Sequence, residues 1–324
     1  MSKKIFITGA TGFVGKHLVS FLRESKKDVR IYGTSFPEKP SSFEDFGADV
    51  LFQLDITNEK NIFETIKKIK PEIVFHLAAV SNVKYSWENR RESLDVNLIG
   101  TFNLFEALRK FSPETKVLFV SSSDVYGISP TESAAIALKE DDPSHVVNPY
   151  AFTKLSGEIL SRFYAQIEGM DIIIARSFPH SGPGQTKDFV CSDWAFQIAR
   201  IEKRLQEPVI NVGNIDVRRD FSDVRDVVKA YALLVEKGRR GEIYNVCSGK
   251  AISLREILDI FFYSSSENVE VKIDPQKLRK ADIPLLLGDN HKIRKETGWK
   301  PEIPLEQTLQ SLLEYWREKV EVSS

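Results

Sequence analysis

Short apolar runs alternate with longer segments of mixed polarity along the first half of the chain. The short runs are rich in β-branched residues, which is typical of strands buried on both faces of a parallel sheet. They lie at residues 5–8, 29–32, 50–54, 73–77, 117–121 and 172–175. Between them, apolar residues recur near a 3.6-residue spacing and predict helices at residues 12–24, 59–69, 92–110 and 149–167. The alternation predicts an α/β fold with a doubly wound parallel sheet, whose ligands bind at the carboxyl ends of the strands.

This alternation stops after Ser177, where a loop containing His180, Gly182 and Gly184 leads into shorter, mixed elements. No linker-like stretch separates the two parts of the chain. We therefore predict a large sheet domain over residues 1–176 and a smaller C-terminal α/β domain over residues 177–324, with some of the chain crossing back. The cleft between two such domains is the usual place for a substrate.

The overall charge of the chain is close to neutral. Its 324 residues include 45 basic and 46 acidic ones, for a formal net charge of -1. The chain therefore has no excess of positive charge that would attract nucleic acid or a membrane surface, and we expect neither as a partner. Cys191 and Cys247 lie far apart without a metal-ligand spacing, which suits a reducing compartment and predicts no metal site. No apolar run at the N-terminus is long enough for a signal peptide, so we expect a cytoplasmic protein.

Three glycines, Gly9, Gly12 and Gly15, follow the first predicted strand directly and open the first predicted helix. Glycine allows a sharp turn, a close approach of backbone N–H groups to a pyrophosphate, and tight packing of helix on strand. The strand-turn-helix context is the one that a dinucleotide-binding loop requires. The motif predicts a Rossmann-type domain that binds a nicotinamide dinucleotide.

The end of the second strand indicates which nicotinamide cofactor is used. An acidic residue there would bond the ribose 2'-hydroxyl of NAD and repel the 2'-phosphate of NADP. The chain has Thr34 and Ser35 at this point and no carboxylate before Glu38. The two hydroxyls could receive a 2'-phosphate, so we expect NADPH, with NADH tolerated.

Tyr150 and Lys154 form a Y-x-x-x-K pair near the start of a predicted helix, which places them on one face, one turn apart. A free tyrosine has a pKa of about 10, and a neighbouring ammonium is expected to lower it toward a usable acid or base. Ser122 lies at the end of the preceding strand, where its hydroxyl can contact the same substrate carbonyl as Tyr150. These three residues are the predicted catalytic group.

Several motifs resemble the extended short-chain dehydrogenases over the whole chain. They are T-G-A-T-G-F-V-G at residues 8–15, Asp55-Ile56, H-L-A-A from His76, V-N-L-I-G-T from Val96, S-S-S-D-V-Y-G from Ser121 and Y-A-F-T-K from Tyr150. Segments of the second half resemble the GDP-mannose branch, and most closely the GDP-6-deoxy-4-keto-D-mannose reductases that form GDP-D-rhamnose. These segments are S-F-P-H-S-G-P-G-Q from Ser177, V-G-N-I-D-V-R-R-D-F from Val212, Y-N-V-C-S-G from Tyr244 and G-W-K-P from Gly298.

The resemblance implies a set of ligand contacts. For the cofactor they are Gly9, Thr11, Gly12, Phe13, Val14, Gly15, Thr34, Ser35, Asp55, Ile56, Leu77, Ala78, Ala79, Tyr150 and Lys154. For a GDP-linked keto sugar they are Ser86, Ser122, Ser123, Asp124, His180, Arg219, Arg279 and Asp282, with Arg218 as a weaker candidate. Arginine suits the diphosphate because its planar fork matches phosphate oxygens. Asn97 is read as a residue that bonds the backbone and fixes its own helix. Pro179 departs from the relatives, which carry Asn there.

Three enzymatic reactions and one non-enzymatic role are compatible with these residues. Reduction of a C4 ketone needs only the cofactor, Tyr150 as proton donor, Ser122 and Lys154. A 4,6-dehydratase needs a further carboxylate base, for which Asp124 is one methylene shorter than the usual Glu. A 4-epimerase usually has an acidic residue after the second strand, which is missing here. A non-catalytic NADP-binding sensor would be expected to lose Tyr150 or Lys154.

We also predict a homodimer that buries the helices at residues 92–110 and 149–167. Apolar residues spread around more of the first helix than one sheet face can cover. They are Leu94, Val96, Leu98, Phe102, Leu104, Phe105 and Leu108. Relatives pair these helices across a two-fold axis, and related dehydratases form tetramers through arginines after the second strand. Residues 35–46 contain no arginine, so the dimer is the expected end state.

Overall fold

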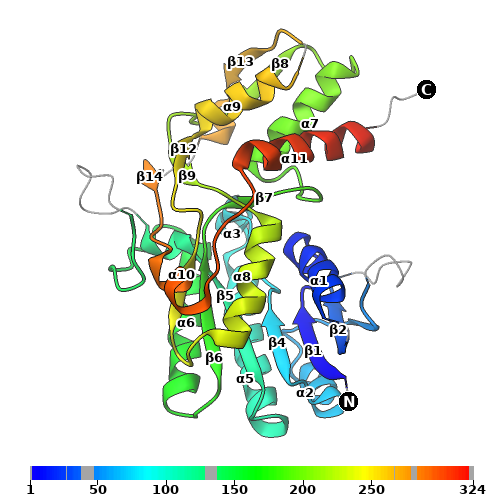
Figure 1. Ribbon diagram of the computed structural model, residues 1–324, viewed down its shortest axis with the longest axis vertical. Coiled ribbons are helices and arrows are strands. Elements are labelled where there is room, and N and C mark those ends of the chain that lie inside the picture. Colours follow the sequence, from blue (N-terminus) through cyan, green and yellow to red (C-terminus); the bar gives the residue numbers. More distant parts are fainter. Residues whose placement is uncertain are drawn as a thin grey trace.

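A parallel sheet forms the centre of the computed structural model, which describes residues 2–26, 28–37, 47–127, 137–265, 267–278 and 283–320. Within these residues the sheet has seven strands in the order β11-β6-β5-β4-β1-β2-β3 (Figure 1). The strands are β1 (Lys3–Thr8), β2 (Val29–Ser35), β3 (Val50–Gln53), β4 (Ile73–His76), β5 (Lys116–Ser122), β6 (Ile172–Ser177) and β11 (Ile243–Val246). The doubly wound sheet predicted from the sequence is confirmed.

The chain reverses its direction of travel across the sheet between β1 and β4. From β1 it proceeds to β2 and β3 on one side, and then returns to β4, β5 and β6 on the other. In an open α/β sheet, the crevice at such a reversal is where ligands bind. The glycine loop after β1 and the loop after β4 therefore border the expected site.

Helices cover both faces of the sheet. One face carries α1 (Phe13–Ser25), α8 (Val224–Lys237) and α10 (His291–Thr297), and the other carries α2 (Glu59–Ile69), α5 (Gly100–Phe111) and α6 (Pro149–Gln166). Capping residues in the sequence determine where two of these helices begin. Asn148 caps α6 by accepting a hydrogen bond from the N–H of Ala151, with Pro149 in the first turn, and Asn58 caps α2 in the same way.

The helix predicted at residues 92–110 is present without a break, but it is not a regular α-helix throughout. It consists of α4 (Arg90–Leu94), a π-helical turn η2 (Asp95–Ile99) and α5. Just beyond the turn, Gly100 packs so closely on Ile56 that an added Cβ would lie 2.6 Å from the Ile56 side chain. A π-turn inserts one extra residue into a helix and often marks a functional site.

A smaller group of elements lies beyond the carboxyl edge of the sheet, in the upper part of Figure 1. Its core is formed by α7 (Val190–Glu202), α9 (Leu254–Tyr263), α11 (Leu305–Lys319) and β8 (Val209–Val212). The exposed strand β13 (Glu270–Ile273) pairs with β8 in parallel. The strand β9 (Arg218–Asp220) pairs with β12 (Ala251–Ser253) and β14 (Leu285–Leu286). The division into domains at residue 177 stays a prediction, and β11, which follows that residue, completes the large sheet.

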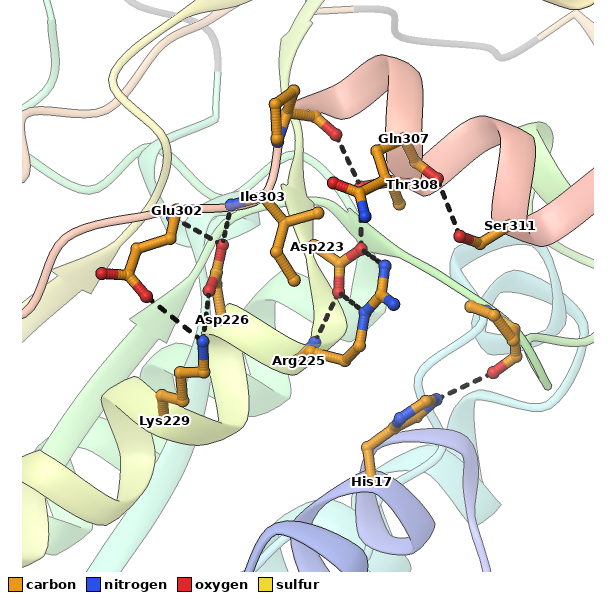
Figure 2. Close-up of polar contacts among 12 residues, drawn as sticks. His17, Asp223, Arg225, Asp226, Lys229, Glu302, Ile303, Gln307, Thr308 and Ser311 are labelled. Atoms are coloured by element: carbon orange, nitrogen blue, oxygen red, sulfur yellow. Dashed lines mark hydrogen bonds and ion pairs between the residues drawn. The ribbon is translucent and has the colours of Figure 1, made fainter.

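Two buried carboxylates at the start of α8 join the large sheet to this smaller group (Figure 2). Asp223 accepts a hydrogen bond of 2.8 Å from the hydroxyl of Thr308 in α11. Asp226 accepts the backbone N–H groups of Glu302 and Ile303, each at 2.8 Å. Because α8 packs on the sheet, these bonds fix the start of α11 relative to the large sheet.

Candidate active site

The glycine loop after β1 has the geometry that a pyrophosphate requires. Gly9 has a φ of +69°, which favours glycine, and a Cβ there would lie 3.0 Å from the backbone of Ala78. A Cβ on Gly15 would lie 2.3 Å from the carbonyl oxygen of Gly9. Gly12 precedes α1 directly, so the N–H groups of its first turn, at Phe13 and Val14, point out of the helix end. This cradle fits the diphosphate of a dinucleotide.

The loop after β4 closes the other side of the crevice. The backbone N–H groups of Leu77 and Ala78 donate to the hydroxyl of Thr8 at 3.1 and 3.2 Å. Leu77, Ala78 and Ala79 are half-buried, as is Thr11 in the glycine loop. The structure therefore brings the predicted dinucleotide-lining residues together across the sheet reversal.

The residues predicted to select the cofactor lie at the end of β2. The strand runs three residues further than predicted, so Thr34 and Ser35 belong to it and are buried. The Thr34 hydroxyl accepts the N–H of Gly9 at 3.0 Å and so supports the glycine loop. The Ser35 hydroxyl has no hydrogen-bond partner among the described residues. Of the two hydroxyls, that of Ser35 is the better placed to donate a hydrogen bond to an acceptor such as a 2'-phosphate.

Asp55 and Ile56, expected at the adenine, follow β3. One carboxylate oxygen of Asp55 accepts the N–H and the hydroxyl of Thr57 at 2.9 and 2.7 Å, which orders the turn into α2. Ile56 is buried and packs against Gly100. The turn is therefore rigid, and the half-buried Asp55 stays accessible.

The three predicted catalytic residues meet at the carboxyl end of β5. Ser122 ends this strand, and its hydroxyl lies close enough to that of Tyr150, in the first turn of α6, to act on the Tyr150 pKa. Lys154 follows one turn later, with its Nζ 5.9 Å from the centre of the Tyr150 ring. The Lys154 ammonium donates to the carbonyl of Val120 at 2.8 Å. This arrangement can hold a substrate oxygen between two hydroxyl groups.

The expected lowering of the Tyr150 pKa is wrong for this structure. Burial raises the pKa of Tyr150 above its ordinary value, and the nearby charge of Asp124 raises it further, against a smaller lowering by the hydrogen bond to Ser122. Burial also lowers the pKa of Lys154 to about 8. Because desolvation disfavours both charged forms, Tyr150 retains its proton at neutral pH. It is thus prepared to donate a proton rather than to accept one.

The interpretation of Asn97 as a backbone-bonding residue is confirmed. Its side-chain oxygen accepts the N–H of Val80 at 2.7 Å, and its amide nitrogen donates to the carbonyl of Val80 at 3.0 Å. The same nitrogen donates to the hydroxyl of Thr153 in α6 at 2.9 Å. Asn97 lies in the π-turn η2, so this turn links the loop after β4 to the helix that carries Tyr150.

The predicted substrate residues near the catalytic group are Ser123 and Asp124, in the short turn η3 (Ser123–Tyr126) after β5. The Ser123 hydroxyl is buried and has no hydrogen-bond partner within the described residues. Asp124 lies close enough to Tyr150 to influence its pKa. Both residues therefore border the site.

His180 lies against the glycine loop. Its ring stacks on that of Phe13, with 6.2 Å between ring centres, and its Nδ1 is 2.9 Å from the carbonyl oxygen of Phe178. On the same side, His17 of α1 is 2.8 Å from the carbonyl oxygen of Pro183 (Figure 2). The loop at residues 178–184 is thus packed directly on the helix that begins at the cofactor cradle.

Arg219 lies on β9, half-buried, and donates to the carbonyl oxygens of Arg218 and Ile283. Arg218 is exposed beside it and donates to the carbonyl of Ala251. Arg279 and Asp282, the other predicted nucleotide contacts, lie outside the described residues. The structure therefore locates one part of the predicted diphosphate site.

Ser86, predicted to contact the substrate, is occupied by a local hydrogen bond in this structure. It is fully buried in α3 (Val83–Glu88), and its hydroxyl donates to the carbonyl of Val83 at 2.7 Å. Ser81, which the sequence analysis did not consider, is exposed and follows Val80, the residue held by Asn97. Its position two residues after Ala79 was a signal that could have identified it.

Known proteins resemble the chain over its full length. The profile of the GDP-mannose 4,6 dehydratase family matches residues 6–312. A GDP-6-deoxy-D-mannose reductase of Pseudomonas aeruginosa is 35% identical over 99% of both chains. A GDP-mannose 4,6-dehydratase of Yersinia enterocolitica is 28% identical over 94% of this chain and 91% of that one.

A solved structure, RMD from Pseudomonas aeruginosa complexed with NADPH, superposes with a TM-score of 0.86. It is 34% identical in sequence, and the match covers 98% of this chain and 100% of that chain. The matched region includes the glycine loop, the Ser122, Tyr150 and Lys154 group and the smaller C-terminal elements. The chain belongs to the GDP-mannose 4,6 dehydratase family, within the extended short-chain dehydrogenases.

Proposed function

We propose that the protein reduces the C4 ketone of GDP-4-keto-6-deoxy-D-mannose with NADPH and forms GDP-D-rhamnose. The observation that carries this proposal is the proximity of the Ser122 and Tyr150 hydroxyls, in which burial keeps Tyr150 protonated. A reductase needs such a proton donor, because the carbonyl oxygen gains a proton as the carbon gains a hydride. The similarity to a named reductase and to an NADPH complex supports the same reaction.

The bound nicotinamide would supply the hydride. Tyr150 would donate its hydroxyl proton to the oxygen at C4, and Ser122 would hydrogen-bond that oxygen where negative charge develops. Lys154, one turn along α6, would stabilise the phenolate that Tyr150 leaves behind. Solvent would then return a proton to Tyr150.

The cofactor would lie across the cradle of Gly9, Gly12 and Gly15, with Ser35 at the 2'-phosphate and Asp55 at the adenine. The unsatisfied Ser35 hydroxyl and the support that Thr34 gives to Gly9 favour NADPH, with NADH tolerated. Both cysteines are free and buried, which fits the reducing cytoplasm that we propose for the protein.

The nucleotide sugar would extend from Ser122 toward the smaller group of elements. We propose that Ser123 and His180 contact the sugar, that Arg219 contacts the diphosphate, and that Arg279 and Asp282 contact the nucleotide. The orphaned Ser123 hydroxyl supports this direction, because buried polar groups usually have partners. For the hydroxyl contact expected after β4 we propose Ser86, with the exposed Ser81 as a second candidate.

A second candidate reaction is 4,6-dehydration, which the proximity of Asp124 to Tyr150 favours. A dehydratase must remove the C5 proton with a carboxylate. The short Asp124 side chain would place its oxygens about 1 Å away from where a glutamate would hold them, which can cost on the order of a hundredfold in rate. Reduction is therefore the preferred assignment.

Product analysis with two substrates separates these reactions. Purified protein is incubated with GDP-4-keto-6-deoxy-D-mannose and NADPH, or with GDP-mannose and oxidised cofactor. A reductase consumes NADPH in the first mixture and leaves GDP-mannose unchanged. Formation of the 4-keto product from GDP-mannose would instead establish dehydration. A UDP-linked keto sugar serves as the control for the base, and NMR of the product gives the configuration at C4.

A further inference from the structure

Glu158 is a buried carboxylate that the catalytic assignment does not use. It lies two turns after Tyr150 in α6 and is 2% exposed. Arg176 of β6 donates to both of its oxygens, from Nε at 2.9 Å and from Nη2 at 2.8 Å. The hydroxyl of Ser121 donates to Oε1 at 2.5 Å. Glu158 thus joins α6 to β5 and β6, directly beneath Ser122.

One face of α6 holds the last residues of β5. Tyr150, Lys154 and Glu158 recur every four residues, so their side chains project from the same side of the helix. Lys154 donates to the carbonyl of Val120, Glu158 accepts from the hydroxyl of Ser121, and Tyr150 lies next to the hydroxyl of Ser122. Three residues of the helix therefore meet three consecutive residues of the strand, and two of them hold it by hydrogen bonds.

We propose that Glu158 is a positioning residue for the reduction: clamped by Arg176 and Ser121, it sets the register of α6 on β5 and provides the negative charge that Lys154 faces along the helix. The inference rests on the proposed function of Tyr150 and Lys154. A buried ion pair contributes little net stability compared with apolar residues, so its value here lies in geometry and charge.

The charges around Lys154 support this role. Burial lowers the pKa of Lys154 to about 8, and the charge of Glu158 opposes that lowering. His76 of β4 is neutral, because burial and the charge of Lys154 lower its pKa to about 3. Tyr150 is protonated, and Asp124 of η3 acts on Tyr150. Arg176 of β6 is paired with Glu158. Without the carboxylate, the Lys154 ammonium would lose its proton at lower pH.

The test removes the ion pair as a unit. Glu158→Gln alone would leave Arg176 buried without a counter-charge and could prevent folding, so the variant is Glu158→Gln with Arg176→Met. The matched control is Glu202→Gln with Arg317→Met, because Arg317 also donates to both oxygens of Glu202, between α11 and α7. Ser121→Ala is a third variant, which removes only the neutral hydrogen bond to Glu158. Circular dichroism and NADPH binding establish that each variant is folded.

The first measurement needs no substrate. NMR of lysine labelled with ¹³C at Cε follows the titration of Lys154, whose signal is identified by its loss in Lys154→Met. In the Glu158/Arg176 variant the Lys154 pKa is expected to fall by about half a unit or more, and in the Glu202/Arg317 control it should match the parent. An unchanged Lys154 pKa in the first variant, or an equal fall in the control, would overturn the proposal.

The second measurement is the pH dependence of ketone reduction. The Glu158/Arg176 variant is expected to lose about twofold or more in kcat at pH 8 with little change in KM, and the alkaline limb of kcat/KM should move to lower pH. Ser121→Ala should lower kcat less and leave the limb in place. A loss of stability without movement of the limb would mean that Glu158 only supports the fold. If the parent protein reduces no keto sugar, the proposed function fails, whereas the NMR titration still decides the role of Glu158.

Discussion

At the scale of single residues, burial acts on Tyr150 and Lys154 in opposite directions. It raises the pKa of Tyr150 and lowers that of Lys154, because desolvation penalises whichever form is charged. A reductase benefits from the first effect, since the tyrosine must carry a proton into the reaction. The lowering of the Lys154 pKa must be limited, since an uncharged lysine would no longer stabilise the phenolate. The site therefore depends on how completely these two side chains are enclosed.

Replacing Tyr150 by Phe should remove the proton donor and little else. Turnover is expected to fall by roughly 10² or more, the usual contribution of a positioned acid, while the Kd for NADPH stays close to that of the parent. Steady-state kinetics and a fluorescence titration measure the two quantities. Tyr164→Phe, on the same helix but bonded to Glu106, is the control and should retain activity. Parent-level turnover in Tyr150→Phe would show that another group donates the proton.

The pH profile of the reaction should report Lys154. Its pKa is lowered to about 8, so the ammonium form is complete below that pH and is lost as the pH rises through it. We expect kcat/KM for the keto sugar to decline above about pH 8. Tyr150 should add no descending limb there, because its pKa is raised. The rate at each pH, with NADPH saturating, gives the profile, and a flat profile up to pH 10 would contradict this role of Lys154.

At the scale of elements, the π-turn η2 connects the cofactor side of the crevice to the catalytic helix. The extra residue in the turn directs Asn97 inward, where it satisfies both backbone groups of Val80 and reaches Thr153. A regular α-helix would require a different residue to face the loop after β4. The irregular turn is therefore part of how the site is assembled.

Asn97→Ala should destabilise the protein and weaken cofactor binding together. The N–H and C=O groups of Val80 would lose their buried partner, which costs about 1–3 kcal/mol in the free energy of unfolding. Urea unfolding and NADPH titration measure the two effects. Asn89→Ala, in the same region, removes only a solvent-exposed hydrogen bond to the carbonyl of Tyr85 and should stay within about 0.5 kcal/mol of the parent. An equal loss of unfolding free energy in both variants would show that the hydrogen bonds of Asn97 to Val80 contribute no more than those of Asn89.

At the scale of the whole molecule, the outer face of α5, η2 and α6 exposes large apolar side chains. On α6 the exposed fractions reach 63% at Ile159 and 70% at Ile167. The remaining members of this apolar face are Ile99, Phe102, Phe152 and Phe163. By contrast, Leu104, Phe105 and Leu108 pack on the sheet, so only part of the predicted apolar excess faces outward. Large exposed apolar side chains on neighbouring helices are typical of an interface, and we propose that they form an isologous homodimer.

Light scattering at micromolar concentration tests the dimer. The parent should have twice the 36.9 kDa mass of one chain, and Ile159→Glu should reduce it to one chain by placing a charge in the interface. Ile273→Glu is the matched control, because Ile273 is 65% exposed on β13, outside the apolar face. A parent mass near one chain would reject the dimer. Four times that mass would show that a tetramer forms even though residues 35–46 contain no arginine.

Local signals in the sequence were sufficient for the strands, the glycine loop and the catalytic group. Gly9, Gly12 and Gly15 are required by backbone geometry, and Tyr150 and Lys154 by helical spacing, so both could be recognised without knowing what surrounds them. The strands β1 to β6 follow from apolar runs that suit burial on both faces. Such features depend on neighbours in sequence, and a linear reading detects them.

Features that depend on partners far along the chain were decided only by the tertiary structure. The strand β11 joins the sheet by pairing with β6, and no local pattern identified it. Glu158 meets Arg176 and Ser121 from two different strands. The direction of the Tyr150 pKa was likewise missed, because Lys154 is visible in the sequence whereas the extent of burial is not. Spacing along the chain determines which groups are available, and desolvation, which arises only when the chain folds, determines their charge.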